Sequence, residues 1–530
     1  MNTYQMSTLI YLAFVLPTIG FAQTERWVYR YSGVNGYQID EAVCLVYGND
    51  GNIYAGGYTW NNDSTNEDFT VISLTDSGSE RWVYKYLTLV RWDGCSSICY
   101  GADGNIYAAG SCTDGDSLYH FTIISLTADG IERWIYQYPD ASVVSQVCYG
   151  EDGNIYAIGS TQGKILVVSV DTNGAERWSY TYPTASGGDG RSIVYGQDGN
   201  IYIVGRTGPS WYTDVTVISL TPSGEERWVY FYNGPGDCDD YGECIIYGAD
   251  DNLYIVGSTC YWWGPGYVFF QGLAISLTPS GMERWTYISP ADPSCFWWGV
   301  YGTDGNLYAA GDYGWDIPFF LVESISDSGT YRWQYIDTTF GYASSIACGN
   351  DGNIYVAGKT SDNWQGGESY FTVISFAPLG SQQWIYRKVW SRYLGNQATS
   401  IVYGSDGNIY AGGLTTDSLT GGDFTVISLS STGIEENKRL KVEGERLKLE
   451  VLPSVVKDNA QIQFTVPERQ RIIMNLYDII GRKVKMIAEG TVEPGVYSYR
   501  LDSSDLNSGV YFFILQGERE SKTKKLLIVR

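Results

Sequence analysis

The residues of this chain best suited to contact a ligand are ten tryptophans that stand outside its regular repeats. An indole ring stacks on the C–H face of a sugar and packs equally well against a protein surface. Large aromatic side chains gathered in surface loops indicate a contact site. The alternative is that these loops fold over one another and bury the same rings as a lid. We predict ligand binding by Trp60, Trp92, Trp211, Trp262, Trp263, Trp297, Trp298, Trp315, Trp364 and Trp390.

Few residues in the sequence are suited to catalysis. His120 is the only histidine, and a catalytic triad needs more partners than the sequence visibly offers. A hydrogen-bonded loop histidine beside a strand is the simpler interpretation of His120. Glycoside cleavage needs only two acids across a cleft, and such a pair cannot be recognised without coordinates. We therefore predict no catalytic residue, with a glycoside-active enzyme as an alternative.

Patterns typical of metal sites are also missing. The sequence has neither the Cys and His spacing of a zinc site nor a twelve-residue calcium loop. Acidic residues accompany the loop tryptophans and could hold calcium or hydrogen-bond hydroxyl groups, although solvated turns are the simpler interpretation. They are Asp63, Asp68, Asp114, Asp116, Asp239, Asp240 and Asp316. We predict no cofactor, and calcium is the one candidate.

The chain has ten cysteines. Most of them replace Ile, Val or Tyr inside predicted strands, which favours small buried hydrophobic residues. Two pairs differ, because each falls almost opposite its partner at the open end of a hairpin. We predict cross-strand disulfides between Cys95 and Cys112 and between Cys238 and Cys260.

These side chains are set in a repeat. A Glu-Arg-Trp-Val-Tyr element or a variant of it recurs about every 50 residues, and each copy is followed by an Asp-Gly-Asn turn or a close variant. That period is typical of propeller blades and far exceeds that of leucine-rich or ankyrin repeats. The repeated tryptophans are Trp27, Trp82, Trp134, Trp178, Trp228, Trp285, Trp333 and Trp384.

One copy predicts one four-stranded sheet. Its expected strands are 43–47, 53–57, 69–74 and 81–86, and Asp-Gly supplies the positive φ angle that the first hairpin needs. Eight such sheets predict an all-β fold, an eight-bladed β-propeller over residues 23–433. The loops that follow the second and the fourth strands emerge on one face of such a ring, and the ten tryptophans are expected there.

The last copy predicts how the ring closes. Its expected Glu-Arg-Trp element is replaced by Ile434-Glu435-Glu436-Asn437, whereas 27–31 forms a Trp strand with no sheet of its own. We expect 27–31 to complete the eighth blade. The alternative is a poor fourth strand formed from Ile434 onward.

Two resemblances accompany this pattern. Trp-x-Tyr-x-Tyr, Asp-Gly-Asn-Ile-Tyr-Ala-Gly-Gly and Asp-Phe-Thr-Val-Ile-Ser are similar to bacterial secreted β-propeller repeats over 24–430, which implies a fold and little chemistry. Ser-Leu-Thr-x-x-Gly-x-Glu-Arg-Trp resembles the docking repeats of eight-bladed quinoprotein dehydrogenases. Those enzymes typically carry two adjacent cysteines over the cofactor, and this sequence has no such pair. A quinoprotein is therefore the less favoured enzyme alternative.

The N-terminus and the overall charge indicate export and limit the partners. Residues 1–22 contain an apolar stretch ending in Gly-Phe-Ala, which predicts a signal peptide cut after Ala22, and no other segment is apolar and long enough for a spanning helix. The net charge is −25, with the acidic excess in residues 1–434. Because nucleic acids and anionic membranes require clustered positive charge, they are disfavoured partners.

The last part of the chain lacks the repeat. A charged linker is expected over 434–446, and short alternating segments over 447–530 predict a small immunoglobulin-like β-sandwich. Asn475-Leu476-Tyr477-Asp478, Gly481-Arg482-Lys483-Val484, Pro494-Gly495-Val496-Tyr497, Leu506-Asn507-Ser508-Gly509-Val510-Tyr511-Phe512 and Thr523-Lys524-Lys525-Leu526 resemble the C-terminal sorting domain of type IX secretion substrates. The resemblance implies the type IX machinery as a partner and a location outside the cell or on its surface.

Together these observations predict a secreted or surface-attached binding protein. Its aromatic loop face would engage a polysaccharide or a cell-surface partner, as in a carbohydrate-binding or adhesion module. A scaffold for protein assembly is the alternative among non-enzymes. An enzyme is the less favoured class.

Overall fold

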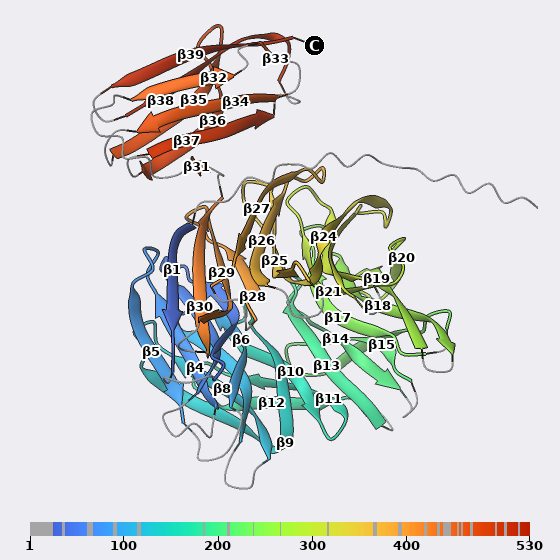
Figure 1. Cartoon of the computed structure of the whole chain (residues 1–530). Coiled ribbons are helices and arrows are strands. Elements are labelled where there is room, and N and C mark those ends of the chain that lie inside the picture. The colour runs from blue at the N-terminus through green and yellow to red at the C-terminus, as the bar shows by residue number, and fades with distance from the viewer. Residues whose placement is uncertain are drawn as a thin grey trace, which may run out of the picture.

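A computed structural model describes most of the chain. The described residues are 25–33, 38–60, 67–87, 93–113, 118–183, 186–208, 212–236, 238–264, 267–314, 317–363, 368–390, 395–417, 421–431, 435–437, 447–452, 455–456, 459–466, 470–492, 495–502, 506–517 and 520–529. The regular structure in these ranges consists of β-strands (Figure 1). The expected all-β class is therefore confirmed.

Residues 25–431, called the ring below, contain antiparallel sheets of four or seven strands. Their strands are β1 (Glu25–Tyr31), β2 (Glu41–Tyr47), β3 (Ile53–Trp60), β4 (Glu67–Leu74), β5 (Glu80–Tyr86), β6 (Gly94–Tyr100), β7 (Ile106–Thr113), β8 (Tyr119–Leu126), β9 (Glu132–Tyr149), β10 (Ile155–Thr161), β11 (Lys164–Val170), β12 (Glu176–Thr181), β13 (Ser186–Tyr195), β14 (Ile201–Gly208), β15 (Asp214–Leu220), β16 (Glu226–Tyr232), β17 (Tyr241–Tyr247), β18 (Leu253–Gly264), β19 (Tyr267–Leu277), β20 (Glu283–Ile288), β21 (Ser294–Tyr301), β22 (Leu307–Tyr313), β23 (Phe319–Ile325), β24 (Tyr331–Cys348), β25 (Ile354–Ser361), β26 (Ser369–Phe376), β27 (Gln382–Lys388), β28 (Gln397–Tyr403), β29 (Asn408–Asp417) and β30 (Gly421–Ser430).

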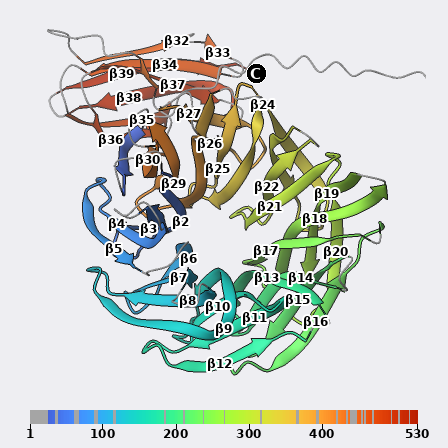
Figure 2. The same ribbon diagram turned by 60° about the horizontal axis from the view of Figure 1, so that its bottom comes forward.

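Four consecutive strands pair side by side as one unit of the ring, for example β2-β3-β4-β5. We call the first strand of each unit its inner strand and the fourth its outer strand. The two seven-stranded sheets arise because β9 and β24 are long, and each is the outer strand of one unit and continues as the inner strand of the next. The inner strands contact one another in the order β2, β6, β9, β13, β17, β21, β24 and β28, and β28 contacts β2 again. Figure 2 shows inner strands such as β6, β17 and β21 around the centre and β5, β12, β16 and β20 at the periphery. The arrangement is propeller-like.

The first hairpin of each unit is encoded locally. In the turn between β2 and β3, Asp50 Oδ1 accepts the backbone N–H of Asn52 at 3.2 Å, and Asp50 Oδ2 accepts the Tyr54 hydroxyl at 2.6 Å. Gly51 has a φ of 80°, which a β-carbon would disfavour. Because every bond joins residues at most four positions apart, the Asp-Gly-Asn-x-Tyr sequence is sufficient to fix the turn.

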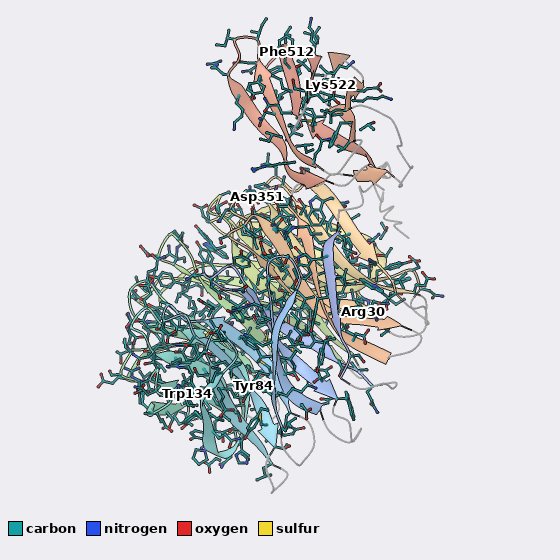
Figure 3. All side chains as sticks on the ribbon, turned by 90° about the vertical axis from the view of Figure 1, so that its left-hand side faces the viewer. Arg30, Tyr84, Trp134, Asp351, Phe512 and Lys522 are labelled. Atoms are coloured by element: carbon teal, nitrogen blue, oxygen red, sulfur yellow. A yellow bond between two sulfur atoms is a disulfide. The ribbon has the colours of Figure 1, made fainter. Side chains whose placement is uncertain are left out.

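The repeated tryptophans join neighbouring units. Trp134 Nε1 donates to the backbone carbonyl of Thr172 at 2.9 Å, and the indole lies so close to Gly174 that a β-carbon there would come within 2.6 Å of the ring. Tyr84, two residues after another repeated tryptophan, donates its hydroxyl to Glu132 Oε2 of the next unit at 2.6 Å. Figure 3 shows Tyr84 and Trp134 close together at the outside of the ring. The aromatic strand of each unit thus fastens it to the unit that follows.

The N-terminal strand fills a place at the far end of the chain. β1 pairs antiparallel with β30, with Val28 opposite Ile427, in the order β1-β30-β29-β28. Glu25 accepts the Tyr386 hydroxyl at 2.8 Å and Lys388 Nζ at 2.5 Å, both from β27. This is the position expected for 27–31, so residues from both ends of the ring share one sheet.

Two further sheets share one core near the C-terminus. They contain β31 (Glu435–Asn437), β32 (Lys448–Leu452), β34 (Asn459–Val466) and β37 (Gly495–Asp502) in one sheet, and β33 (Val455–Val456), β35 (Gln470–Asp478), β36 (Lys483–Val492), β38 (Gly509–Gln516) and β39 (Ser521–Ile528) in the other. Buried side chains from both sheets, such as Phe464 and Phe513, form a single cluster. β31 lies inside the expected linker but pairs with β37, so the sheet begins earlier in the chain than expected.

Within the described ranges, no helix is long and apolar enough to cross a membrane.

Candidate functional site

The inner strands of the ring carry the most varied side chains. Each contains a β-bulge at the same level, where one extra residue stands between two paired positions. The extra residues are Val43, Ser96, Ser145, Arg191, Glu243, Trp297, Ser344 and Thr399. Bulges re-aim side chains, and these eight lie on the strands that surround the centre.

A glycine on the second strand makes room for each bulge. A β-carbon on Gly311 would lie 1.9 Å from the carbonyl oxygen of Cys295, and one on Gly257 would lie 1.8 Å from that of Tyr241. Such contacts are impossible, so only glycine allows the two backbones to approach there. This explains the second glycine of the Tyr-Ala-Gly-Gly repeat. The glycine is needed for the structure of each unit, whereas the bulge residue opposite it varies from unit to unit.

A cavity of about 410 Å³ opens beside one of these bulges. It lies between the unit of β21–β24 and the next inner strand, and it is lined by Trp297, Trp298, Asp312, Pro318, Tyr342, Ala343 and Ser344. We call this cavity the indole pocket. Trp297 and Trp298 are 42% and 41% exposed, so the two rings present apolar surface to solvent at its edge. Its size falls in the range of small-molecule sites.

Asp312 is the one carboxylate among the residues that line the indole pocket. Its Oδ1 accepts the indole N–H of Trp297 at 2.5 Å. Burial raises the pKa of Asp312 to about 6, although the Trp297 hydrogen bond favours the ionised form. Among the described residues, Asp312 has no ion pair with an arginine or a lysine. A partly buried carboxylate without a cation therefore faces two indoles.

On one side of the pocket, a chain of hydrogen bonds crosses three units. Tyr342 donates its hydroxyl to Gln397 Oε1 at 3.0 Å, and Gln397 Nε2 donates to Glu41 Oε1 at 2.7 Å. Tyr58 donates to the other oxygen of Glu41 at 2.8 Å. These contacts hold the Tyr342 ring in place at the pocket wall.

On the other side lies a paired set of charges. Arg206 binds both oxygens of Asp189, at 2.9 and 3.1 Å, and its guanidinium lies 4.7 Å from the centre of the Tyr241 ring. Arg191 bridges Asp189 at 3.2 Å and Glu243 at 3.8 Å. Burial raises the pKa of Glu243, which the nearby Arg191 partly offsets. Each carboxylate here has an arginine partner, whereas Asp312 has none among the described residues.

The structure places only some of the predicted tryptophans. Trp297 and Trp298 do share a site, but they belong to β21 and not to a loop, because, counted from the Asp-Gly-Asn turns, they stand where Val43 and Cys44 stand in β2. Trp60 ends β3, and Trp262 and Trp263 lie in β18, whose pairing with β19 continues to Gly264, so these three are also strand residues. Trp92, Trp211, Trp315 and Trp364 lie outside the described residues.

Trp390 is not part of the indole pocket. Its ring packs edge-on against Phe371, with centres 6.5 Å apart, and Lys388 Nζ lies 4.7 Å from its centre. It contacts the core cluster around β26 and β28. Asp312 and Ser344 were not predicted as site residues. Their positions could have indicated a role, because they lie at or beside the bulges of inner strands, where the residue type differs between copies of the repeat.

The two predicted cysteine pairs differ. Cys238 and Cys260 are joined by a disulfide with α-carbons 5.6 Å apart. The Cys95–Cys112 prediction is wrong: both are free, and Cys95 lies opposite Gly110 because the bulge after it shifts the register. The nearest sulfur to Cys95 is that of Cys44, 3.9 Å away in the neighbouring unit.

The acidic candidates have structural partners where they are described. Asp239 accepts the backbone N–H of Thr213 at 2.8 Å, and Asp240 is buried and accepts that of Gly234 at 2.5 Å. Asp68 is buried beside Lys85, at 3.9 Å. Asp63, Asp114, Asp116 and Asp316 fall outside the described residues. Within the described part of the chain, no three His, Cys, Asp or Glu side chains are grouped so as to hold a metal ion.

His120 is largely buried in β8, opposite Cys112, and its Nδ1 lies 3.4 Å from the backbone oxygen of Tyr138. It is therefore a strand residue with a backbone partner, and it is not among the residues that line the indole pocket.

Comparison with known proteins identifies one part of the chain. Residues 450–529 match the family model of the secretion system C-terminal sorting domain. This family marks proteins exported by type IX secretion, so the protein is delivered to the cell surface or released from the cell. No curated protein matches the sequence.

Solved structures resemble the chain only distantly. The chain is similar to virginiamycin B lyase from Staphylococcus aureus, with 15% identity, a TM-score of 0.41 and coverage of 64% of this chain and 94% of that one. It is similar to polysaccharide lyase Uly1, with 12% identity, a TM-score of 0.42 and coverage of 63% and 90%. It is also similar to an α-L-arabinofuranosidase from Fusarium graminearum, with 10% identity, a TM-score of 0.35 and coverage of 77% and 97%. Likenesses at this level carry no argument about activity.

Proposed function

We propose that this protein is an exported glycan-binding protein whose ligand site is the indole pocket. The observation that carries the proposal is the pair of indoles that are more than 40% exposed beside a cavity with polar groups. Indole faces stack on the C–H faces of sugars, while hydroxyl and carboxylate groups bind sugar hydroxyls. Asp312, Tyr342 and Ser344 supply such groups on the other walls. A polysaccharide outside the cell is then the expected partner.

The architecture that we propose for this function is an eight-bladed propeller over residues 23–433, followed by an immunoglobulin-like sandwich. Pairing of β1 with β30 and the circle of contacts among inner strands support this interpretation. Residues 1–22, which we propose to be a signal peptide, lie outside the described residues. In this interpretation the pocket lies at the centre of the ring, where the bulge residues differ between units and can be varied without changing the fold.

Binding is favoured over cleavage by the contents of the pocket. A glycosidase needs two carboxyl groups, one as acid and one as nucleophile or base. Asp312 alone, with its pKa raised to about 6, would suit the acid. The described residues that line the pocket include no second carboxylate. A scaffold for protein assembly would use the same aromatic surface but would not discriminate among sugars.

The test is a glycan array with the purified secreted protein, followed by titration of the best ligand. Trp298→Ala removes an exposed indole from the pocket, and we expect at least a tenfold weaker affinity, as for a central contact residue. Trp390→Ala is the matched control, because that ring packs on the core away from the pocket. Failure of every glycan to bind, or equal losses in both variants, would refute the proposal. Release of reducing sugars from a bound glycan would instead indicate an enzyme.

A further inference from the structure

The indole pocket combines aromatic faces with a negative charge that lacks a counter-charge. Trp297, Trp298 and Tyr342 supply three rings around the cavity, and Asp312 supplies the carboxylate. A neutral sugar would use the rings and accept or donate hydrogen bonds, but it would leave the charge of Asp312 uncompensated. Uncompensated charge in a partly buried position is unfavourable. With a neutral ligand, the pocket would therefore lack a positive charge to balance Asp312.

Some acidic side chains of the ring are paired with arginines, whereas others, such as the buried Glu323 and Asp240, are held by hydroxyl and backbone N–H groups. Asp312 differs from both groups because it lines an open cavity. Asp189, on an inner strand two units away, binds two nitrogens of Arg206. Asp337 is buried and is bound by Arg387, and Asp423 is buried and is bound by Arg30. Asp312 instead has only the neutral N–H of Trp297 as its side-chain partner among the described residues.

A cationic group on the ligand satisfies both features at once. An ammonium ion is attracted to the faces of tryptophan and tyrosine and forms a charge-assisted hydrogen bond with a carboxylate. The net charge of the chain, −25, adds long-range attraction for cations. A second carboxylate on the ligand would be repelled by the same field. The pocket thus selects among glycans by charge.

We infer that the indole pocket binds an amino sugar with a free ammonium group, placed between the indoles and Asp312. This inference rests on the proposed glycan-binding function and names the class of sugar. The sugar ring would stack on one indole, and its ammonium group would donate to the Asp312 oxygens. An N-acetylated sugar keeps the ring but loses the charge, so it isolates the contribution of the cation.

The experiment is calorimetric titration of the purified secreted protein with two probes, a glucosamine hexamer and an N-acetylglucosamine hexamer. We expect the glucosamine hexamer to bind at least tenfold more tightly. In Asp312→Asn the preference should fall to less than threefold, while affinity for the acetylated probe changes little. Near-UV circular dichroism checks that the variant is folded. Trp298→Phe keeps a smaller ring and is expected to weaken the glucosamine probe several-fold.

The control is Asp129→Asn, which removes one negative charge from the same ring at a largely exposed turn residue that does not line the pocket. If Asp129→Asn abolishes the preference as well, general attraction by the acidic chain is responsible and the inference is overturned. Equal binding of both probes by the unmodified protein would overturn the inference but support glycan binding. If neither probe binds and the array is also empty, the proposed function fails, and the inference fails with it.

Discussion

Removing the indole of Trp27 should release the N-terminal strand from the ring. Trp27 Nε1 donates to the carbonyl of Asp76 at 2.8 Å, and its ring lies against Gly78, where a β-carbon would come within 2.5 Å. β1 is an edge strand, paired only with β30. Its attachment therefore depends on one ladder and on the contacts of its side chains, so it can detach without unfolding of the other units.

The magnitude follows from burial. Truncation of a fully buried Trp to Ala costs about 3 to 5 kcal/mol, and the Trp27 ring is half-buried. With the lost hydrogen bond included, we expect about 2 kcal/mol. A local opening equilibrium shifted by this amount accelerates amide exchange about thirtyfold. The amides of β30 that pair with β1, such as those near Ile427, should accelerate together with β1.

Hydrogen–deuterium exchange with mass spectrometry measures this difference by peptide. Trp134→Ala is the matched control, since its indole makes the same contact with Thr172 and Gly174 in the middle of the ring. Around Trp134 β9 pairs with β8, but the strand continues without a break into residues 142–149, which pair with β10; because this continuation anchors it, less than threefold local acceleration is expected there. Equal acceleration in both variants, or acceleration of β1 without β30, would refute the role assigned to β1.

Four further results are expected. Gly130→Ala should destabilise the protein by about 2 kcal/mol in urea unfolding, because the φ of Gly130 is 81° and the new β-carbon would lie 2.5 Å from the Trp82 ring. Gly94→Ala is the control and should cost less, because its β-carbon would lie 3.8 Å from its nearest neighbour, the β-carbon of Tyr58. Affinity for a cationic sugar should fall as the pH drops through about 6, where Asp312 becomes protonated, and Asp312→Asn should remove this dependence. A profile set by other titratable groups of the inner units, Glu243 and Cys295, would persist in the variant. Because the folded pKa of Asp312 is raised, its ionisation destabilises the fold as the pH rises through that value, so Asp312→Asn should melt higher than the unmodified protein at pH 8 but not at pH 4. Cys238→Ser should lower stability by about 3 kcal/mol, since the disulfide closes a loop of separation 22, and a reducing agent should lower the melting temperature of the unmodified protein but not of the variant.

The regular part of the ring was predictable because its determinants are local. The Asp50 turn is fixed by residues no more than four apart, and the Trp-x-Tyr pattern places the docking indole on one face of a strand. The pairing of β1 with β30 was also predictable, since the last copy lacks a Trp strand and the N-terminus has an extra one. These are features that a repeat makes visible by comparison among its copies.

The site could not be predicted to the same extent, because it depends on register and on contacts between units. The bulge at Trp297 shifts the pairing of β21 by one residue, and a count outward from the turn does not include such a shift. The same effect placed Cys95 opposite Gly110 instead of near Cys112. Asp312 looked like an ordinary strand residue, and only the folded ring brings it against the indole of Trp297.

The continuous strands β9 and β24 set where new sequence could be inserted into this protein. Each passes from the outer edge of one unit to the inner strand of the next without a loop, pairing with one neighbour in its first half and with another in its second half. A peptide grafted into either half would break the ladder of that half. Grafts directly after Tyr86, Tyr232 or Lys388, the last residues of β5, β16 and β27, would interrupt none of these ladders, so engineered display on this scaffold should begin there.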